Sequence, residues 1–174
     1  MKLPKTAATA FTLIEVTLAL GVAGFCLTTI MGLLSVGLSS NQASSEQTVS
    51  ASIAKAVMAD LRATPAGAQN SPRFGFSVPA GGATTTGTSY SNPQTLFLRQ
   101  DSSPSVSGTV GGAAVAGQSR YRVTVAFYTS PTQLTAAGVR ILVTWPALAD
   151  SATTTTWPVN YTGSCEVLTA LDRN

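Results

Sequence analysis

One long apolar stretch dominates the first part of the chain. It runs from Phe11 to Leu38, and no charged residue occurs from Val16 to Ser45. A membrane-spanning helix needs about 20 mostly apolar residues, whereas the apolar part of a cleaved secretory signal is usually about 7–15 residues long. The length therefore predicts a transmembrane helix over residues 11–38 and argues against an ordinary cleaved signal peptide.

The chain after Leu38 is polar but keeps a helical repeat. Four apolar residues recur at every fourth position and so share one helical face. They are Val49, Ile53, Val57 and Leu61. The next proline is Pro65, which favours the end of a helix because its ring excludes the helical hydrogen bond. We expect one helix from Phe11 to Ala63, whose amphipathic half, within residues 39–64, packs on a globular head.

Beyond Pro65 the pattern changes to alternation of apolar and polar residues. The clearest alternating segments are Arg120–Tyr128 and Val139–Trp145. Shorter candidate strands are Phe74–Val78, Thr95–Arg99 and Cys165–Leu171. Loops rich in Gly, Ser and Thr separate them, mainly Ala80–Asn92, Asp101–Ser119 and Asp150–Thr156. The sequence thus predicts an α+β fold, in which residues 65–174 form a β-rich head with a small antiparallel sheet covered on one face by the helix.

The charges are few, and their positions suggest an orientation in the membrane. Charged residues make up 10% of the chain, against about 25% in a typical soluble domain. Lys2 and Lys5 precede the apolar stretch, which places the N-terminus in the cytoplasm and the head in the periplasm by the positive-inside rule. No cluster of Lys or Arg follows, so no nucleic-acid partner is expected.

The residue types that carry catalysis or bind metals are scarce. The chain has no histidine, the usual general base and the commonest metal ligand. Cys26 lies in the apolar stretch and Cys165 near the C-terminus, so we expect two free thiols. Five carboxylates outside the apolar stretch are scattered without calcium-loop spacing: Asp60, Asp101, Asp150, Glu166 and Asp172. We expect no catalytic residue, no metal and no cofactor, and therefore no enzyme.

Two Trp-Pro pairs leave two interpretations open. Trp145-Pro146 and Trp157-Pro158 could form a surface that binds a sugar or a peptide. Such pairs more often end strands and cover the edge of a core. We favour the core interpretation for both.

One carboxylate, that of Glu15, stands at the start of the apolar stretch. An ionised carboxylate inside a bilayer costs several kcal/mol by rough estimate unless it is paired or reaches the interface. In a simple anchor it would lie at the headgroup level, where the positive end of the helix dipole favours it.

The residues around Glu15 suggest a more specific interpretation. The string Ala10-Phe11-Thr12-Leu13-Ile14-Glu15-Val16 resembles the class III signal of type IV prepilins and type II secretion pseudopilins. The resemblance implies that a prepilin peptidase removes a leader, residues 1–10, by cleavage between Ala10 and Phe11, and that it methylates the new N-terminus. Glu15 then corresponds to the glutamate at the fifth mature position. The family usually has Gly where this chain has Ala10, another small residue.

The resemblance also implies a role in assembly. The Glu15 carboxylate of an incoming subunit would pair with the Phe11 amine of a neighbour, since a buried charge is tolerated when it is paired. The expected function is that of a structural subunit, and a minor one, of a type IV pilus-like or type II secretion pseudopilus filament. Its partners would be the peptidase, other pilin or pseudopilin subunits and inner-membrane lipid.

A second resemblance and an alternative function complete the expectations. Four scattered segments look similar to the Verru_Chthon cassette protein B group of prepilin-like proteins: VTLALGVAGF, GLLSVGL, ADLRATP and VRILVTWPA. The alternative function is a single-pass, membrane-anchored periplasmic binding or scaffold protein, whose prepilin-like start is fortuitous or unprocessed.

Overall fold

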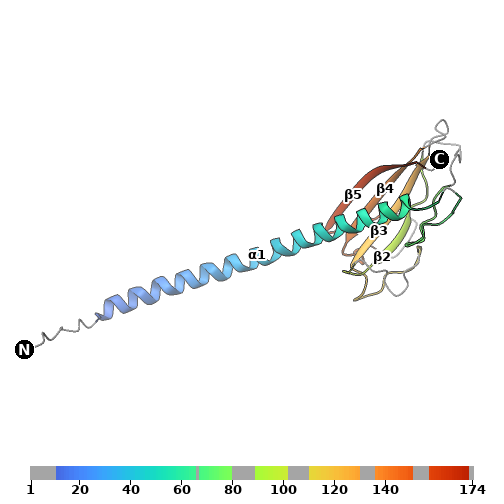
Figure 1. Cartoon of the computed structure of the whole chain (residues 1–174). Helices are drawn as coiled ribbons and strands as arrows, with labels where there is room; N and C mark the ends of the chain where they lie inside the picture. The colour runs from blue at the N-terminus through green and yellow to red at the C-terminus, as the bar shows by residue number, and fades with distance from the viewer. Residues whose placement is uncertain are drawn as a thin grey trace, which may run out of the picture. The chain divides into compact units, whose positions relative to one another are not determined.

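The protein has one long helix and a small antiparallel sheet (Figure 1). The computed structural model describes residues 11–65, 67–79, 89–101, 110–129, 136–150 and 157–172. Its elements are α1 (Leu13–Arg62), β1 (Ser89–Tyr90), β2 (Gln94–Leu98), β3 (Tyr121–Thr129), β4 (Ala136–Trp145) and β5 (Gly163–Asp172). The chain divides into two compact units, one ending at Ser44 and one starting at Ser45, which we call the head. The predicted α+β fold class is confirmed.

Helix α1 ends close to the predicted position. It stops at Arg62, where the sequence predicted Ala63. Thr64 marks the end, because its N–H group bonds the carbonyl of Leu61 at 3.3 Å and its hydroxyl bonds the carbonyl of Asp60 at 3.0 Å. These bonds satisfy carbonyl groups that the last helical turn leaves without a helical partner.

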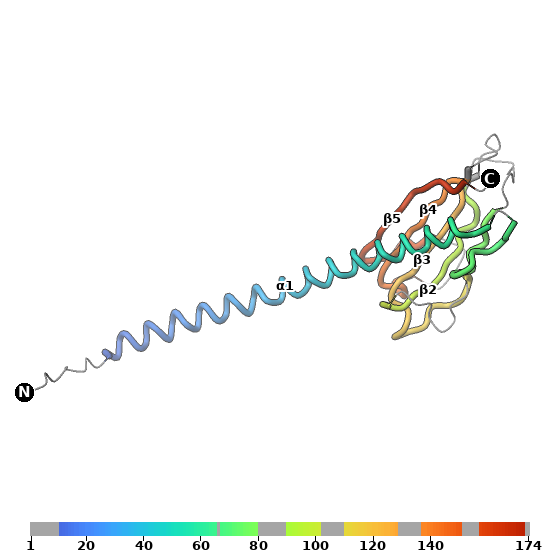
Figure 2. Tube along the Cα trace, viewed as in Figure 1, coloured from blue at the N-terminus to red at the C-terminus, as the bar shows by residue number. Residues whose placement is uncertain are grey.

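The strands form an antiparallel sheet in which β3 and β4 are central. β4 lies between β3 and β5, and both β1 and β2 pair with the other edge of β3, as the trace in Figure 2 shows for the longer strands. Tyr90 lies opposite Tyr128, whereas Gln94 lies opposite Val125. Three residues between β1 and β2 therefore face two residues of β3. The segment between β1 and β2 thus has one residue more than the segment of β3 that it faces. This arrangement is a β-bulge, and it separates the two short strands.

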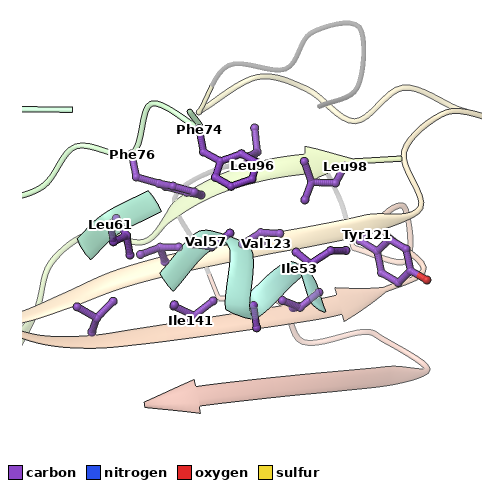
Figure 3. Close-up of a cluster of buried hydrophobic side chains, with 14 of the residues drawn as sticks. Ile53, Val57, Leu61, Phe74, Phe76, Leu96, Leu98, Tyr121, Val123 and Ile141 are labelled. Carbon is purple, nitrogen blue, oxygen red and sulfur yellow. The ribbon is translucent and has the colours of Figure 1, made fainter. Parts of the chain in front are cut away.

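The predicted helical face does pack on the sheet. Ile53, Val57 and Leu61 are buried in one cluster with apolar side chains of the strands (Figure 3). The strand residues in this cluster include Leu96, Leu98, Tyr121, Val123, Ile141 and Val143. The fourth member of the repeat, Val49, is half-buried at its edge. Burial of these side chains contributes roughly 1.5–3 kcal/mol each and is the main term that holds α1 to the sheet.

The opposite face of the sheet, which we call the outer face, is also partly covered. Arg122 and Thr124 of β3 point away from the helix-facing cluster but are buried. Residues after β4 lie against this region: the N–H group of Ala147 bonds the carbonyl of Arg120, and the carboxylate of Asp150 is 4.0 Å from the guanidinium of Arg122. Burial lowers the pKa of Arg122, and the charge of Asp150 partly offsets that effect.

Two predictions for the segment between α1 and β2 were wrong. Phe74–Val78 is not assigned as a strand, and among the described residues its one ladder contact is a single bridge between Asn70 and Ser77. Gly75 has a φ of 76°, a left-handed conformation that interrupts an extended chain. The second error concerns β1, which lies within a segment predicted to be a loop.

Gly163 at the start of β5 is required by its cross-strand neighbour. The indole ring of Trp145 lies over Gly163, in the space that a Cβ atom would occupy. We expect Gly163→Ala to lower the free energy of unfolding by about 1–3 kcal/mol, because a buried indole cannot move aside without repacking the core. Chemical denaturation of the full chain in detergent measures the change.

The matched control is Gly138→Ala, where an added Cβ would lie 3.3 Å from the Cβ of Tyr128. This contact is tight but not prohibitive, so the control should have the smaller effect. Equal stabilities of the Gly163→Ala variant and the unmodified chain would contradict the role assigned to Trp145.

Candidate functional site

Thr12 and Glu15 form a capping box at the start of α1. The Thr12 N–H group donates to Glu15 Oε2 at 2.9 Å, and the Thr12 hydroxyl donates to the same oxygen at 2.8 Å. In return the Glu15 N–H group lies 3.4 Å from the Thr12 hydroxyl oxygen. This reciprocal arrangement satisfies N–H groups that the first turn of a helix leaves without partners. It explains why α1 begins at Leu13 and not at Phe11.

Two of the three predicted site residues, Phe11 and Glu15, lie on either side of the start of α1. Phe11 precedes the helix and is 85% exposed. Glu15 lies in the first helical turn, four residues later. Ala10 lies outside the described residues. The residue that would become the N-terminus thus directly precedes the threonine to which the Glu15 carboxylate is bound.

Thr12 is the site residue that the sequence analysis missed. Its spacing from Glu15, Thr-x-x-Glu, is the known signature of a capping box. That signal was present in the sequence but was obscured, because both residues also belong to the longer prepilin-like string. Glu15 therefore has an intramolecular partner that the sequence analysis did not assign to it.

The part of α1 that follows Glu15 is long and apolar enough to cross a membrane. Its large apolar side chains are exposed, among them Leu18, Leu20, Phe25, Ile30, Leu33 and Leu38. Hydroxyl groups within it bond carbonyls of the same helix: those of Thr17, Thr28, Thr29, Ser35 and Ser39, at 2.9–3.3 Å. Because each of these hydroxyl donors has a partner in its own helix, the segment is suited to a lipid environment.

Three of the scattered carboxylates of the head bind groups of their own chain. Asp60 accepts the N–H groups of Arg73 and Phe74 at 2.9 and 3.0 Å. Asp150 accepts N–H groups of Val159 and Asn160 at 2.7–3.0 Å. Glu166 pairs with Arg140 at 2.7 Å. Within the part of the chain that the structure describes, no group of three potential metal ligands is found.

The two Trp-Pro pairs have different surroundings. Trp145 is buried and packs edge-on against Tyr121 at 6.1 Å, as expected for a core residue. Trp157 is half-buried on the outer face, where the guanidinium of Arg140 stacks 4.2 Å from its ring centre and Tyr90 packs edge-on at 6.4 Å. The core interpretation is therefore right for Trp145 and incomplete for Trp157.

Both cysteines carry free thiols. Cys26 is exposed on the apolar part of α1, and Cys165 is half-buried on β5, next to the core. Neither thiol belongs to a cluster of potential ligands among the described residues.

The chain was compared with protein-family models, with curated proteins and with solved structures, and no significant match was found in any of the three. Any function must therefore be inferred from the residues of this chain and their geometry.

Proposed function

We propose that the protein is a structural subunit of a type IV pilus-like or type II secretion pseudopilus filament, matured by cleavage before Phe11. The observation that carries this proposal is a carboxylate at the start of an otherwise uncharged, exposed apolar helix, in the sequence context Ala10-Phe11-Thr12-Leu13-Ile14-Glu15. The chain offers no comparable support for catalysis. It has no histidine, and the carboxylates of Asp60, Asp150 and Glu166 are bound to groups of its own chain.

Processing is the first step of the proposal. Hydrolysis of the peptide bond between Ala10 and Phe11 leaves a carboxylate on the leader and a new amine on Phe11. The peptidase then transfers a methyl group to this amine from a sulfonium methyl donor, which leaves as the thioether while the amine loses a proton. The capping box supports this step, because it starts α1 after Thr12 and leaves Phe11 outside the helical hydrogen bonds. A peptide bond outside a helix is open to a protease, whereas one inside a helix must first be unwound.

Assembly is the second step. Before assembly the membrane holds the subunit by α1, with Glu15 bound to Thr12. In the filament the Glu15 carboxylate pairs with the Phe11 amine of a neighbouring subunit. The pairing favours one register between neighbouring helices, since a shifted register leaves both charges unpaired in an apolar environment.

The remaining parts of the proposal concern location. The subunit spans the inner membrane once, with its N-terminus in the cytoplasm and its head in the periplasm, until it enters a filament. Lys2 and Lys5 before the apolar stretch support this orientation.

Mass spectrometry of the native N-terminus tests the proposal. The chain isolated from its own membranes is expected to begin at a methylated Phe11. An intact chain that begins at Met1 and is fully functional would support the anchored scaffold instead. As a control, deletion of the prepilin peptidase gene in the same cells should restore residues 1–10.

A further inference from the structure

One asparagine of the head begins a short sequence that is typical of a modification site. Residues 160–162 read Asn-Tyr-Thr, which is the pattern Asn-x-Thr with a middle residue other than proline. In this pattern the asparagine side chain is the acceptor for a saccharide. Three other asparagines lack it, because the second residue after Asn41, Asn70 and Asn92 is alanine, proline and glutamine, respectively.

The structure places this acceptor sequence on the surface of the head. Residues 159–162 lie outside any helix or strand, directly before β5, and all four are exposed. The amide of Asn160 is also at the surface, where its Nδ2 atom donates an exposed hydrogen bond to Asp150 Oδ1 at 3.1 Å. Water replaces such a bond at little net cost, so this amide can leave Asp150 and enter the site of an enzyme.

The backbone of the segment is held on both sides of the acceptor. The N–H groups of Val159 and Asn160 donate to the carboxylate of Asp150 at 2.7 and 3.0 Å. On the other side, the N–H group of Thr162 donates to the carbonyl of Trp145 at 2.9 Å. These bonds use backbone donors and leave the side chain of Thr162 exposed. Both side chains of the acceptor sequence are therefore within reach of an enzyme in the folded head.

The two residues beside Asn160 have large apolar surfaces in water. Val159 is 83% exposed and Tyr161 is 43% exposed. A saccharide attached between them would remove part of this apolar surface from water, which is favourable. Its hydroxyl groups would stay hydrated, so the modified segment would present a more polar surface than the bare chain.

We propose that Asn160 is a site of N-linked glycosylation, which takes a saccharide carried on a lipid pyrophosphate. The Asn160 Nδ2 atom attacks the anomeric carbon of the first sugar. A carbon–nitrogen bond forms, the bond from that carbon to the phosphate oxygen breaks, the amide nitrogen loses a proton, and the lipid pyrophosphate leaves. Since Ser and Thr share a hydroxyl at the third position of the pattern, the transferase recognises the hydroxyl of Thr162.

The inference rests on one part of the proposed function, the orientation that places the head in the periplasm, and not on cleavage before Phe11. Trypsin releases residues 141–173 as one peptide, in which Asn160 is the only asparagine. In the chain purified from its own membranes, this peptide should carry the mass of a saccharide, and fragmentation should assign that mass to Asn160.

The same mass spectra also read the N-terminus, which separates the two proposals. A methylated Phe11 together with an unmodified Asn160 would contradict the glycosylation alone. A fully functional chain that begins at Met1 and carries a modified Asn160 would contradict the proposed maturation alone.

Four variants make the test specific. Asn160→Gln should lose the saccharide, and Asn92→Gln, at an exposed asparagine outside the pattern, should keep it. Thr162→Val keeps the shape of threonine without its hydroxyl, and enzyme sites built to bind a hydroxyl discriminate strongly against such analogues, so occupancy should fall at least about tenfold. Thr162→Ser restores the hydroxyl and should restore occupancy. The near-UV signal of buried Trp145 shows whether each variant is folded.

Three results would overturn the inference. The first is an unmodified Asn160 in the chain from its own membranes. The second is a saccharide on a serine or threonine of the same peptide and not on Asn160, since the linkage is then to oxygen. The third is occupancy of Asn160 that is the same in the Thr162→Val variant.

Discussion

Replacing Asp60 with alanine is expected to lower the free energy of unfolding of the head by about 3 kcal/mol. Asp60 is buried at the end of α1, and its two carboxylate oxygens accept the N–H groups of Arg73 and Phe74. Alanine leaves both N–H groups without these acceptors, and hydrogen bonds to a charged group contribute about 1.5–3 kcal/mol each. Chemical denaturation of the full chain in detergent, followed by the near-UV signal of buried Trp145, measures the loss.

Two further variants separate the carboxylate's hydrogen bonds from its charge. Asp60→Asn keeps one acceptor oxygen and should have an intermediate effect. Glu166→Ala removes an exposed ion pair with Arg140 and should change stability by less than about 1 kcal/mol. If the Asp60→Ala variant unfolds at the same denaturant concentration as the Glu166→Ala variant, the bonds from Asp60 to Arg73 and Phe74 do not stabilise the head.

Replacing Glu15 with glutamine is expected to abolish assembly while leaving the membrane-inserted subunit intact. Glutamine at this position of a capping box can still accept from Thr12, so α1 should start at the same residue. The charge that is proposed to pair with the neighbour's Phe11 amine is lost, however. Removing one partner of a buried ion pair costs about 3–5 kcal/mol, which corresponds to a loss of subunit affinity of about a hundredfold or more. The yield of sheared filaments measures assembly.

Thr12→Ala provides the matched control for Glu15→Gln. This variant loses the hydroxyl of the capping box but keeps the carboxylate. A lost cap costs about 1 kcal/mol of helix stability, so filament yield should fall much less than in Glu15→Gln. Resistance to carbonate extraction shows whether both variants remain inserted. Normal filament yield from Glu15→Gln would refute the proposed charge pairing.

The sequence predicts the helix and the long strands well because their patterns are local. The four-residue repeat that includes Ile53 and Val57 indicates which side of α1 packs on the sheet, and alternation locates β3 and β4 to within a few residues. In such elements, local preference and tertiary packing agree, which is where pattern-based prediction is most dependable.

The errors occur where distant residues decide the local conformation. Phe74–Val78 alternates like a strand, but its first residue is held by a distant carboxylate. Asp60, 13 residues before Arg73, accepts the N–H groups of Arg73 and Phe74. β1 has only two residues, and its pairing with Tyr128 depends on β3, which follows much later in the chain. The residues that cover the outer face likewise depend on a distant contact, in which the ring of Trp157 stacks on the guanidinium of Arg140. None of these contacts leaves a periodic signal.

The residues of the candidate site also differ in how readily the sequence reveals them. Phe11 and Glu15 were recognised from their string, whereas Thr12 needed a second signature within that string to be noticed.

The continuity of α1 from Leu13 to Arg62 has a mechanical consequence. Its last turns carry Ile53, Val57 and Leu61, which pack in the head. A pulling force on the head is therefore carried by the helix's own ladder of backbone bonds and by the shear strength of the packed face. Under load, the head should yield either by stretching these last turns of the helix or by sliding them off the sheet.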